Sequence, residues 1–197
     1  MRLKLAALTI SLLLLTGCGR LQEERDTFLR RYYEHLTGYS ATANVTADYG
    51  DWTYRYTVTM SGTLDEGTLT VTAPENIAGL GFAWTAEGGT AEYDGVRLDT
   101  GALSEDGLSP VDGMRLTLNA LVSGRQLSCE PDTLAGEDVL MLELSNPNWV
   151  NEDSTVAVWL AAEDGALRRA EVRWQGTTVV TYDFSTFNYI YEMETED

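Results

Sequence analysis

Apolar and polar side chains alternate along most of the chain from residue 39 onward, and this period of two constrains the fold more than any other feature. In residues 41–47 and 52–60, Ala, Val, Tyr, Trp and Met occupy every second position, and Thr, Asn and Arg occupy the positions between them. Gly50 and Asp51 separate the two runs, which together predict a hairpin with one apolar and one polar face. Further strands are predicted at 69–73, 82–86, 90–93, 96–98, 140–144, 156–160, 170–174 and 180–184. Strands at this spacing indicate a wide antiparallel sheet.

Two segments show helical spacing instead. The first has side chains three or four positions apart on one face: Leu21, Arg25, Phe28, Tyr32 and Leu36. We expect this helix to end at Gly38. The second begins at Ser109 and Pro110, because serine caps a helix and proline suits its first turn, and it ends at Gly124.

The expected fold class is therefore α+β and mostly β, with a curved antiparallel sheet, an N-terminal helix and one lid helix. Eight or more strands that each offer an apolar row must curl to hide it, and two helices offer little cover. Either an apolar cleft stays open to a ligand, or the core is fully packed. The sequence leaves both alternatives open.

The N-terminus carries the pattern of an export signal. Arg2 and Lys4 precede an apolar run from Leu5 to Leu15, which is shorter than the roughly 20 residues of a membrane-spanning helix. The run closes with Leu15-Thr16-Gly17-Cys18, which resembles the lipobox of bacterial lipoproteins. We expect residues 1–17 to be cleaved as a signal peptide and Cys18 to be acylated. The protein would then be anchored at the extracytoplasmic face of the cell membrane, since two or more acyl chains anchor stably.

Beyond the tether of residues 18–20, we expect residues 21–197 to form a single domain. The whole chain has 13 basic and 31 acidic residues, and without Arg2 and Lys4 the basic count falls to 11. Nucleic-acid binding is excluded as a function, because it depends on Lys and Arg contacts with phosphates. With Cys18 acylated, Cys129 has no disulfide partner, and we expect it to be buried.

The sequence predicts a protein that is not an enzyme. His35 is the only histidine, and we expect it to be a helix-surface or packing residue. No nucleophile elbow, phosphate-binding loop or zinc-ligand spacing is present, so we expect no catalytic residue, no metal and no cofactor.

Trp159 is the candidate interface residue. It alternates out of phase with Val156, Val158 and Leu160 and should therefore face the opposite side of the sheet. A tryptophan exposed there would indicate a surface for a partner.

The order of elements also resembles a known superfamily. The signal and lipobox, the N-terminal helix and the aromatic hairpin are followed by Pro74-Glu75-Asn76-Ile77-Ala78-Gly79-Leu80, by Glu92-Tyr93-Asp94-Gly95-Val96-Arg97-Leu98 and by the Ser109-Pro110 helix. This series resembles the LolA/LolB-like lipoprotein carriers, and most of all the GerS germination lipoproteins of spore-forming clostridia.

The resemblance implies a half-barrel with a helical lid that binds acyl chains, lipoproteins or protein partners without catalysis. The germination relatives imply a chaperone-like cofactor of a cell-wall (spore cortex) amidase. Two hypotheses follow: a membrane-anchored scaffold that binds a protein partner or itself as a homodimer, and a receptor that holds a hydrophobic ligand such as a lipid in its cleft. A tethered protein can receive a ligand but cannot ferry it.

Overall fold

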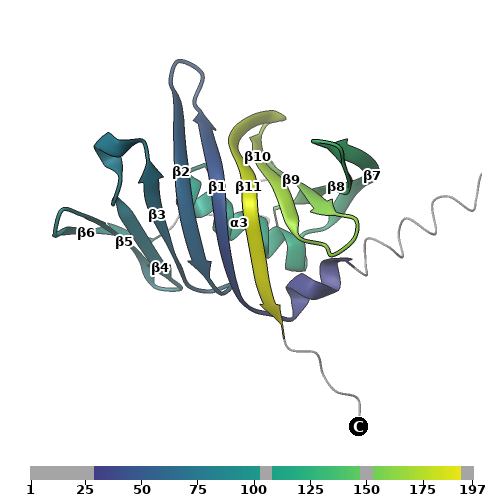
Figure 1. The fold of residues 1–197 in the computed structure, drawn as a ribbon, viewed down its shortest axis with the longest axis horizontal. Helices are drawn as coiled ribbons and strands as arrows, with labels where there is room; N and C mark the ends of the chain where they lie inside the picture. The colour runs from purple at the N-terminus through teal and green to yellow at the C-terminus, as the bar shows by residue number, and fades with distance from the viewer. Residues whose placement is uncertain (1–28, 103–107, 147–152, 192–197) are drawn as a thin grey trace, which may run out of the picture.

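The computed structural model describes residues 29–102, 108–146 and 153–191 (Figure 1). The signal peptide, Cys18 and the tether predicted at residues 18–20 lie outside this part of the chain. Within it, no helix is long and apolar enough to cross a membrane.

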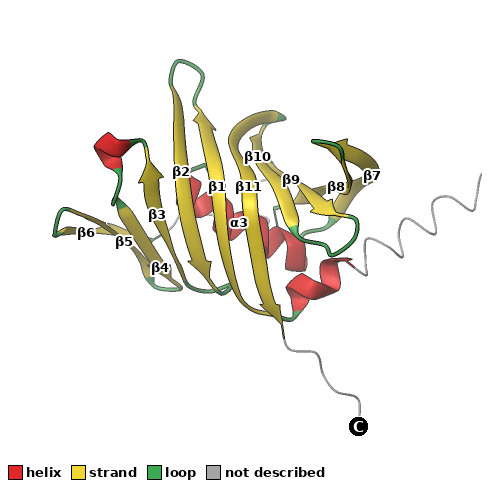
Figure 2. Ribbon diagram, viewed as in Figure 1, coloured by secondary structure: helices red, strands yellow, loops and turns green. Residues whose placement is uncertain are grey.

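The described strands form one antiparallel sheet of eleven strands, in the order β6-β5-β4-β3-β2-β1-β11-β10-β9-β8-β7. The chain therefore starts its sheet in the middle, runs outward to β6, and returns through a helix to the other edge (Figure 2). The strands are β1 (Leu36–Asp48), β2 (Thr53–Gly62), β3 (Gly67–Ala73), β4 (Gly81–Thr85), β5 (Gly88–Tyr93), β6 (Val96–Gly101), β7 (Gln126–Leu134), β8 (Glu137–Ser145), β9 (Ser154–Ala161), β10 (Leu167–Trp174) and β11 (Thr177–Tyr191). A short 3-10 helix, η1 (Glu75–Ile77), joins β3 to β4.

The predicted aromatic hairpin is confirmed as β1 and β2, with Ala41 opposite Met60 and Val45 opposite Tyr56. Its alternation places Ala, Val and Met side chains on the face that carries the core, which we call the inner face. The other face, called the outer face, carries mainly threonine and charged residues. The predicted fold class, a curved antiparallel sheet with helices on one side, is thus confirmed.

The predicted lid helix is also confirmed, as α3 (Pro110–Ser123). The hydroxyl of Ser109 accepts a hydrogen bond from the Asp112 amide at 3.2 Å, and the helix ends at Gly124, whose amide donates to the Ala120 carbonyl. α3 lies on the inner face against β8, β9 and β10. Tyr182 of β11 donates to the carbonyl of Pro110 at 2.6 Å, which ties the first turn of α3 to the centre of the sheet.

The N-terminal helix is described over residues 29–34, and its predicted end at Gly38 is wrong. Leu36 already pairs with Tyr191, and Gly38 lies inside β1 opposite Ile190, so strand pairing overrides the helical spacing there. Arg30 joins this helix to the end of α3: its guanidinium donates to the carbonyls of Leu121 at 2.8 Å and of Gly124 at 2.9 Å.

Candidate binding surface

The apolar side chains of the inner face are buried at the centre of the sheet and become exposed towards its β6 edge. One row of directly opposed side chains runs from the centre of the sheet to its β6 edge: Ala41, Met60, Leu69, Phe82, Ala91 and Leu98. Met60 and Leu69 are 3% and 2% exposed, Phe82 is half-buried, and Leu98 at the edge is 62% exposed. The core of the protein therefore thins out towards β6.

The apolar side chains at this end form a surface open to solvent. Val96 lies two residues before Leu98 on the same face and is 61% exposed, and Tyr93, opposite Val96 in β5, is 44% exposed. α3 makes its main contacts with β8, β9 and β10, and Tyr93, Val96 and Leu98 remain exposed to solvent. We call Phe82, Tyr93, Val96 and Leu98 the open surface.

The loop of the β1–β2 hairpin adds a second group of exposed aromatic rings, Tyr49, Trp52 and Tyr54, which we call the hairpin tip. Trp52 is 68% exposed, and Tyr54 stacks on Tyr56 with ring centroids 6.4 Å apart. Tyr49 donates to the carbonyl of Leu108 at 2.9 Å, which holds the tip beside the start of α3. Burial raises the pKa of Tyr49, with further contributions from Tyr56 and from other neighbours.

A hollow of about 260 Å³ lies between the open surface and the first turn of α3. Its walls combine Phe82 and Val111 with the polar side chains of Thr90, Ser109 and Asp112. The volume is at the low end for small-molecule sites, and the walls are mainly apolar with a few polar side chains. Among the described residues, the side chains of the inner face are buried around α3 and become exposed towards β6.

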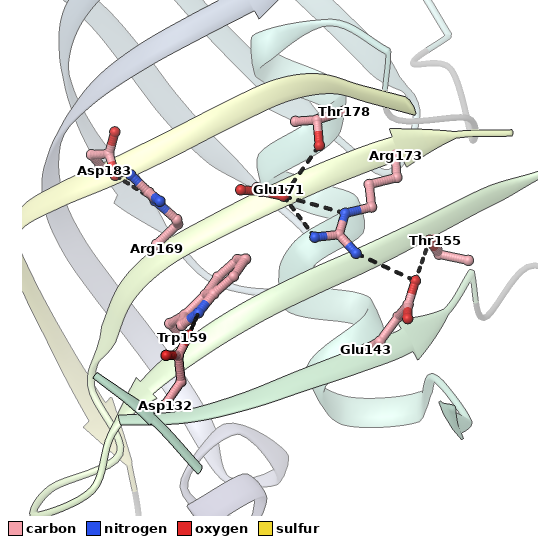
Figure 3. Close-up of polar contacts among 9 residues, drawn as sticks. All are labelled: Asp132, Glu143, Thr155, Trp159, Arg169, Glu171, Arg173, Thr178 and Asp183. Atoms are coloured by element: carbon pink, nitrogen blue, oxygen red, sulfur yellow. Dashed lines mark hydrogen bonds and ion pairs between the residues drawn. The ribbon is translucent and has the colours of Figure 1, made fainter. Parts of the chain in front are cut away.

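Trp159 faces the outer side of the sheet, as its alternation predicts, but its expected exposure is wrong: the side chain is 8% exposed. Leu134 and Met141 pack beside it, and the guanidinium of Arg169 lies 5.8 Å from its ring centroid. Its indole N–H donates to Asp132 at 2.9 Å, and this hydrogen bond, followed by one from the Thr133 amide, lowers the pKa of Asp132 (Figure 3). Side chains from three other strands thus cover the ring. Its role in an interface stays a prediction.

The charged groups around Trp159 form a network on the outer face of β8 to β11 (Figure 3). Arg173 contacts Glu171 at 2.8 Å and Glu143 at 3.6 Å, and Arg169 contacts Asp183 at 2.7 Å. Thr178 also donates to Glu171. Each arginine of this network is paired with at least one carboxylate of a strand in the same sheet, so the network stabilises the strands and offers no free basic group to an anionic ligand.

The other residues singled out in the sequence do not combine into a chemical site. His35 lies exposed in the turn after the N-terminal helix. Cys129, for which the sequence predicts burial, is half-buried on β7, where it packs against the core. Among the described residues, no group of His, Cys, Asp and Glu is arranged to hold a metal ion.

The sequence alone does not identify the open surface and the hairpin tip as a site. Alternation gives the correct face for these side chains, but Val96 and Leu98 look like core residues when only the pattern is known. A usable signal is the short length of β6 together with its place at the end of the consecutive hairpins, which indicates an uncovered edge once the direction of α3 is known.

No family model matches the sequence, and no curated protein matches it. Several solved structures are similar in fold. An uncharacterized conserved protein from Thermus thermophilus has a TM-score of 0.50 and 9% identity, over 88% of this chain and 91% of that chain. A LolA superfamily protein from Nitrosomonas europaea has a TM-score of 0.47 and 10% identity, over 85% and 94% of the two chains. The lipoprotein LppX from Mycobacterium tuberculosis has a TM-score of 0.46 and 14% identity, over 87% and 96%.

Proposed function

We propose that the protein is a membrane-anchored extracytoplasmic lipoprotein that binds a polypeptide partner, without catalysis, at the open surface and the hairpin tip. The observation that carries the proposal is the placement of its exposed apolar side chains. Of the eight large apolar side chains that are exposed among the described residues, six belong to these two groups. Clustered apolar side chains on a soluble surface mark interaction sites, whereas scattered ones need no explanation.

The chemistry of the surface favours a polypeptide over an acyl chain. An acyl chain needs a deep apolar cavity, and the hollow beside α3 is small, with a carboxylate, Asp112, in a wall that Phe82 and Val111 otherwise make apolar. Tyr and Trp side chains, in contrast, are enriched at protein interfaces because they combine a large apolar area with a hydrogen-bonding group. The hairpin tip offers three of them.

The position of the surface suits a protein anchored at its N-terminus. The helix at residues 29–34 and the hairpin tip lie at opposite ends of the long central strands (Figure 1). β1 spans 13 residues, which corresponds to about 40 Å at the usual rise of a strand. An anchor on Cys18 would therefore direct the hairpin tip away from the membrane, towards the cell wall.

The resemblance to the germination lipoproteins makes a spore cortex amidase the first partner to test. The lipid receptor is the alternative, and the same experiment separates the two.

The experiment is site-specific photo-crosslinking in the cells that make the protein. A photo-reactive phenylalanine derivative replaces Tyr54, which is 44% exposed in the hairpin tip, or Leu127, which is 43% exposed on the opposite edge of the sheet and serves as the matched control. We expect a polypeptide adduct at Tyr54, identified by mass spectrometry, and none of it at Leu127. Adducts with lipid at Tyr54 would support the receptor instead. Equal adducts at both positions would contradict the proposed surface.

A further inference from the structure

The two edges of the sheet differ in how they are protected. β7 carries Pro131, which has no amide hydrogen, and a proline on an edge strand hinders the addition of another strand. β6 has no proline, and all six of its residues are exposed. The β6 edge is therefore able to pair with a further strand.

The direction of the free backbone groups on β6 follows from its turn. Asp94 and Gly95 have positive φ angles of 50° and 77°, as in a two-residue type I′ turn, so the flanking residues Tyr93 and Val96 form a hydrogen-bonded pair. Because hydrogen-bonded and non-hydrogen-bonded pairs alternate, Leu98 also bonds to β5. The amides and carbonyls of Arg97 and Asp99 consequently point away from the sheet.

We propose that two copies of the chain pair antiparallel through β6, with Leu98 on the two-fold axis. In this register Arg97 lies opposite Asp99 of the second copy, and both residues direct their free backbone groups towards each other. Four backbone hydrogen bonds form, and each Arg97 faces a carboxylate on the outer face. On the inner face Leu98 meets Leu98 of the second copy, and Val96 lies opposite Thr100.

Charge selects this register over the two neighbouring ones. A two-fold axis at Arg97 or at Asp99 also aligns free backbone groups, but it places like charges directly opposite one another, which destabilises a strand pair. Within the described part of the chain, neither side chain has an ion-pair partner: Arg97 donates weakly to Thr90 at 3.4 Å, and one oxygen of Asp99 accepts from the Gly101 amide at 2.9 Å. Glu92 lies opposite Arg97 in β5, so the paired sheet alternates acid, base and acid.

The self-pairing uses the backbone edge of β6 and leaves the hairpin tip free, so it is compatible with the partner proposed above although both involve the open surface. It also joins the open surfaces of two copies across the axis, so that one anchored dimer presents a doubled apolar area.

Disulfide trapping in native membranes tests the pairing on the full chain, in a Cys129→Ser background. Leu98→Cys places two sulfurs across a non-hydrogen-bonded pair, with Cα atoms about 4.5 Å apart, within the range of a disulfide. Val96→Cys is the matched control, because it is equally exposed but lies about 13 Å from its counterpart, four residues along the strand. We expect Leu98→Cys to form covalent dimers rapidly. Val96→Cys should form no more dimer than the Cys129→Ser background does. Equal rates for the two variants would overturn the pairing.

Exchanging the charges at Arg97 and Asp99 provides a second test, which addresses the register of the pairing. Arg97→Asp and Asp99→Arg should each lower the rate of Leu98→Cys trapping about tenfold, equivalent to about 1.4 kcal/mol. The double exchange should restore it, because opposite charges face each other again. A double variant as slow as the single ones would overturn the proposed register even if dimers form.

Discussion

The indole N–H of Trp159 donates to the carboxylate of Asp132 across 2.9 Å, and it does so from a ring that is 8% exposed. The pair connects β9 to the edge strand β7, two strands away in the sheet. A residue expected to serve as an exposed interface thus holds the outer layer of the sheet together.

Replacing Trp159 tests this role. Trp159→Ala should lower the free energy of unfolding by about 3 kcal/mol, because it removes a large buried ring. Trp159→Phe should cost less, since it keeps most of the packing and loses the hydrogen bond to Asp132. Urea unfolding followed by circular dichroism measures both. Trp52→Ala is the control, and as Trp52 is 68% exposed we expect a change within about 0.5 kcal/mol. Similar losses at the two tryptophans would contradict the assignment.

Arg30 is predicted to fix the N-terminal helix to α3. Arg30→Met removes two hydrogen bonds to the carbonyls of Leu121 and Gly124 and should lower the free energy of unfolding by about 2 kcal/mol. Arg31→Met is the matched control, because Arg31 is exposed on the next position of the same helix. Denaturant titration of both variants decides the point, and an equal effect would show that the contact with α3 contributes nothing.

The absence of a side chain at Gly67 leaves space for the ring of Trp84. A Cβ atom at Gly67 would lie 2.3 Å from Cζ2 of Trp84, which is 2% exposed, so Gly67→Ala must displace a buried side chain. We expect a loss of about 2 kcal/mol, typical of overpacking. Gly38→Ala meets no atom closer than 3.6 Å and should be nearly neutral. Thermal melting measures the stability of both variants. Equal melting midpoints for the two would contradict the packing around Trp84.

Three buried tyrosines predict a loss of stability at alkaline pH. Burial raises the pKa of Tyr33, Tyr39 and Tyr182 above the ordinary value of 10.0. The folded state therefore keeps these protons when the unfolded chain loses them. The resulting stability is complete below about pH 10 and declines as the pH rises further. Urea unfolding at about pH 8 and about pH 10.5, on either side of the ordinary tyrosine pKa, should show the decline, and absorbance titration should show these rings ionising only as the protein unfolds. A pH-independent midpoint across this range would contradict their burial.

The local patterns are enough to predict most strands and the lid helix. Alternation locates β1 to β6, and the pair Ser109–Pro110 locates the start of α3. β7 escapes prediction because Pro131 is atypical of a strand and because few large apolar residues follow Leu127, so the pairing with β8 decides its structure. The same dependence on distant partners explains the error at Gly38.

The site is harder to predict than the fold. The alternation along β9 predicts the face of the sheet on which Trp159 lies. The burial of its side chain depends on side chains from β7, β8 and β10, which no local pattern specifies. Val96 and Leu98 show the converse. They continue the apolar row of the core, but they are exposed because the main contacts of α3 are with β8, β9 and β10 and not with the β6 edge.

The occupancy of the hairpin tip in the cell is the most direct test of the proposed function. Hydroxyl-radical footprinting compares the oxidation rate of Trp52, 68% exposed in the isolated chain, between intact cells and purified protein, with Leu127 compared in the same way as the control. Binding of a polypeptide at the tip predicts that Trp52 is protected in cells while Leu127 is oxidised equally in both. Equal oxidation of Trp52 in the two settings would show that nothing covers the tip and would contradict the account.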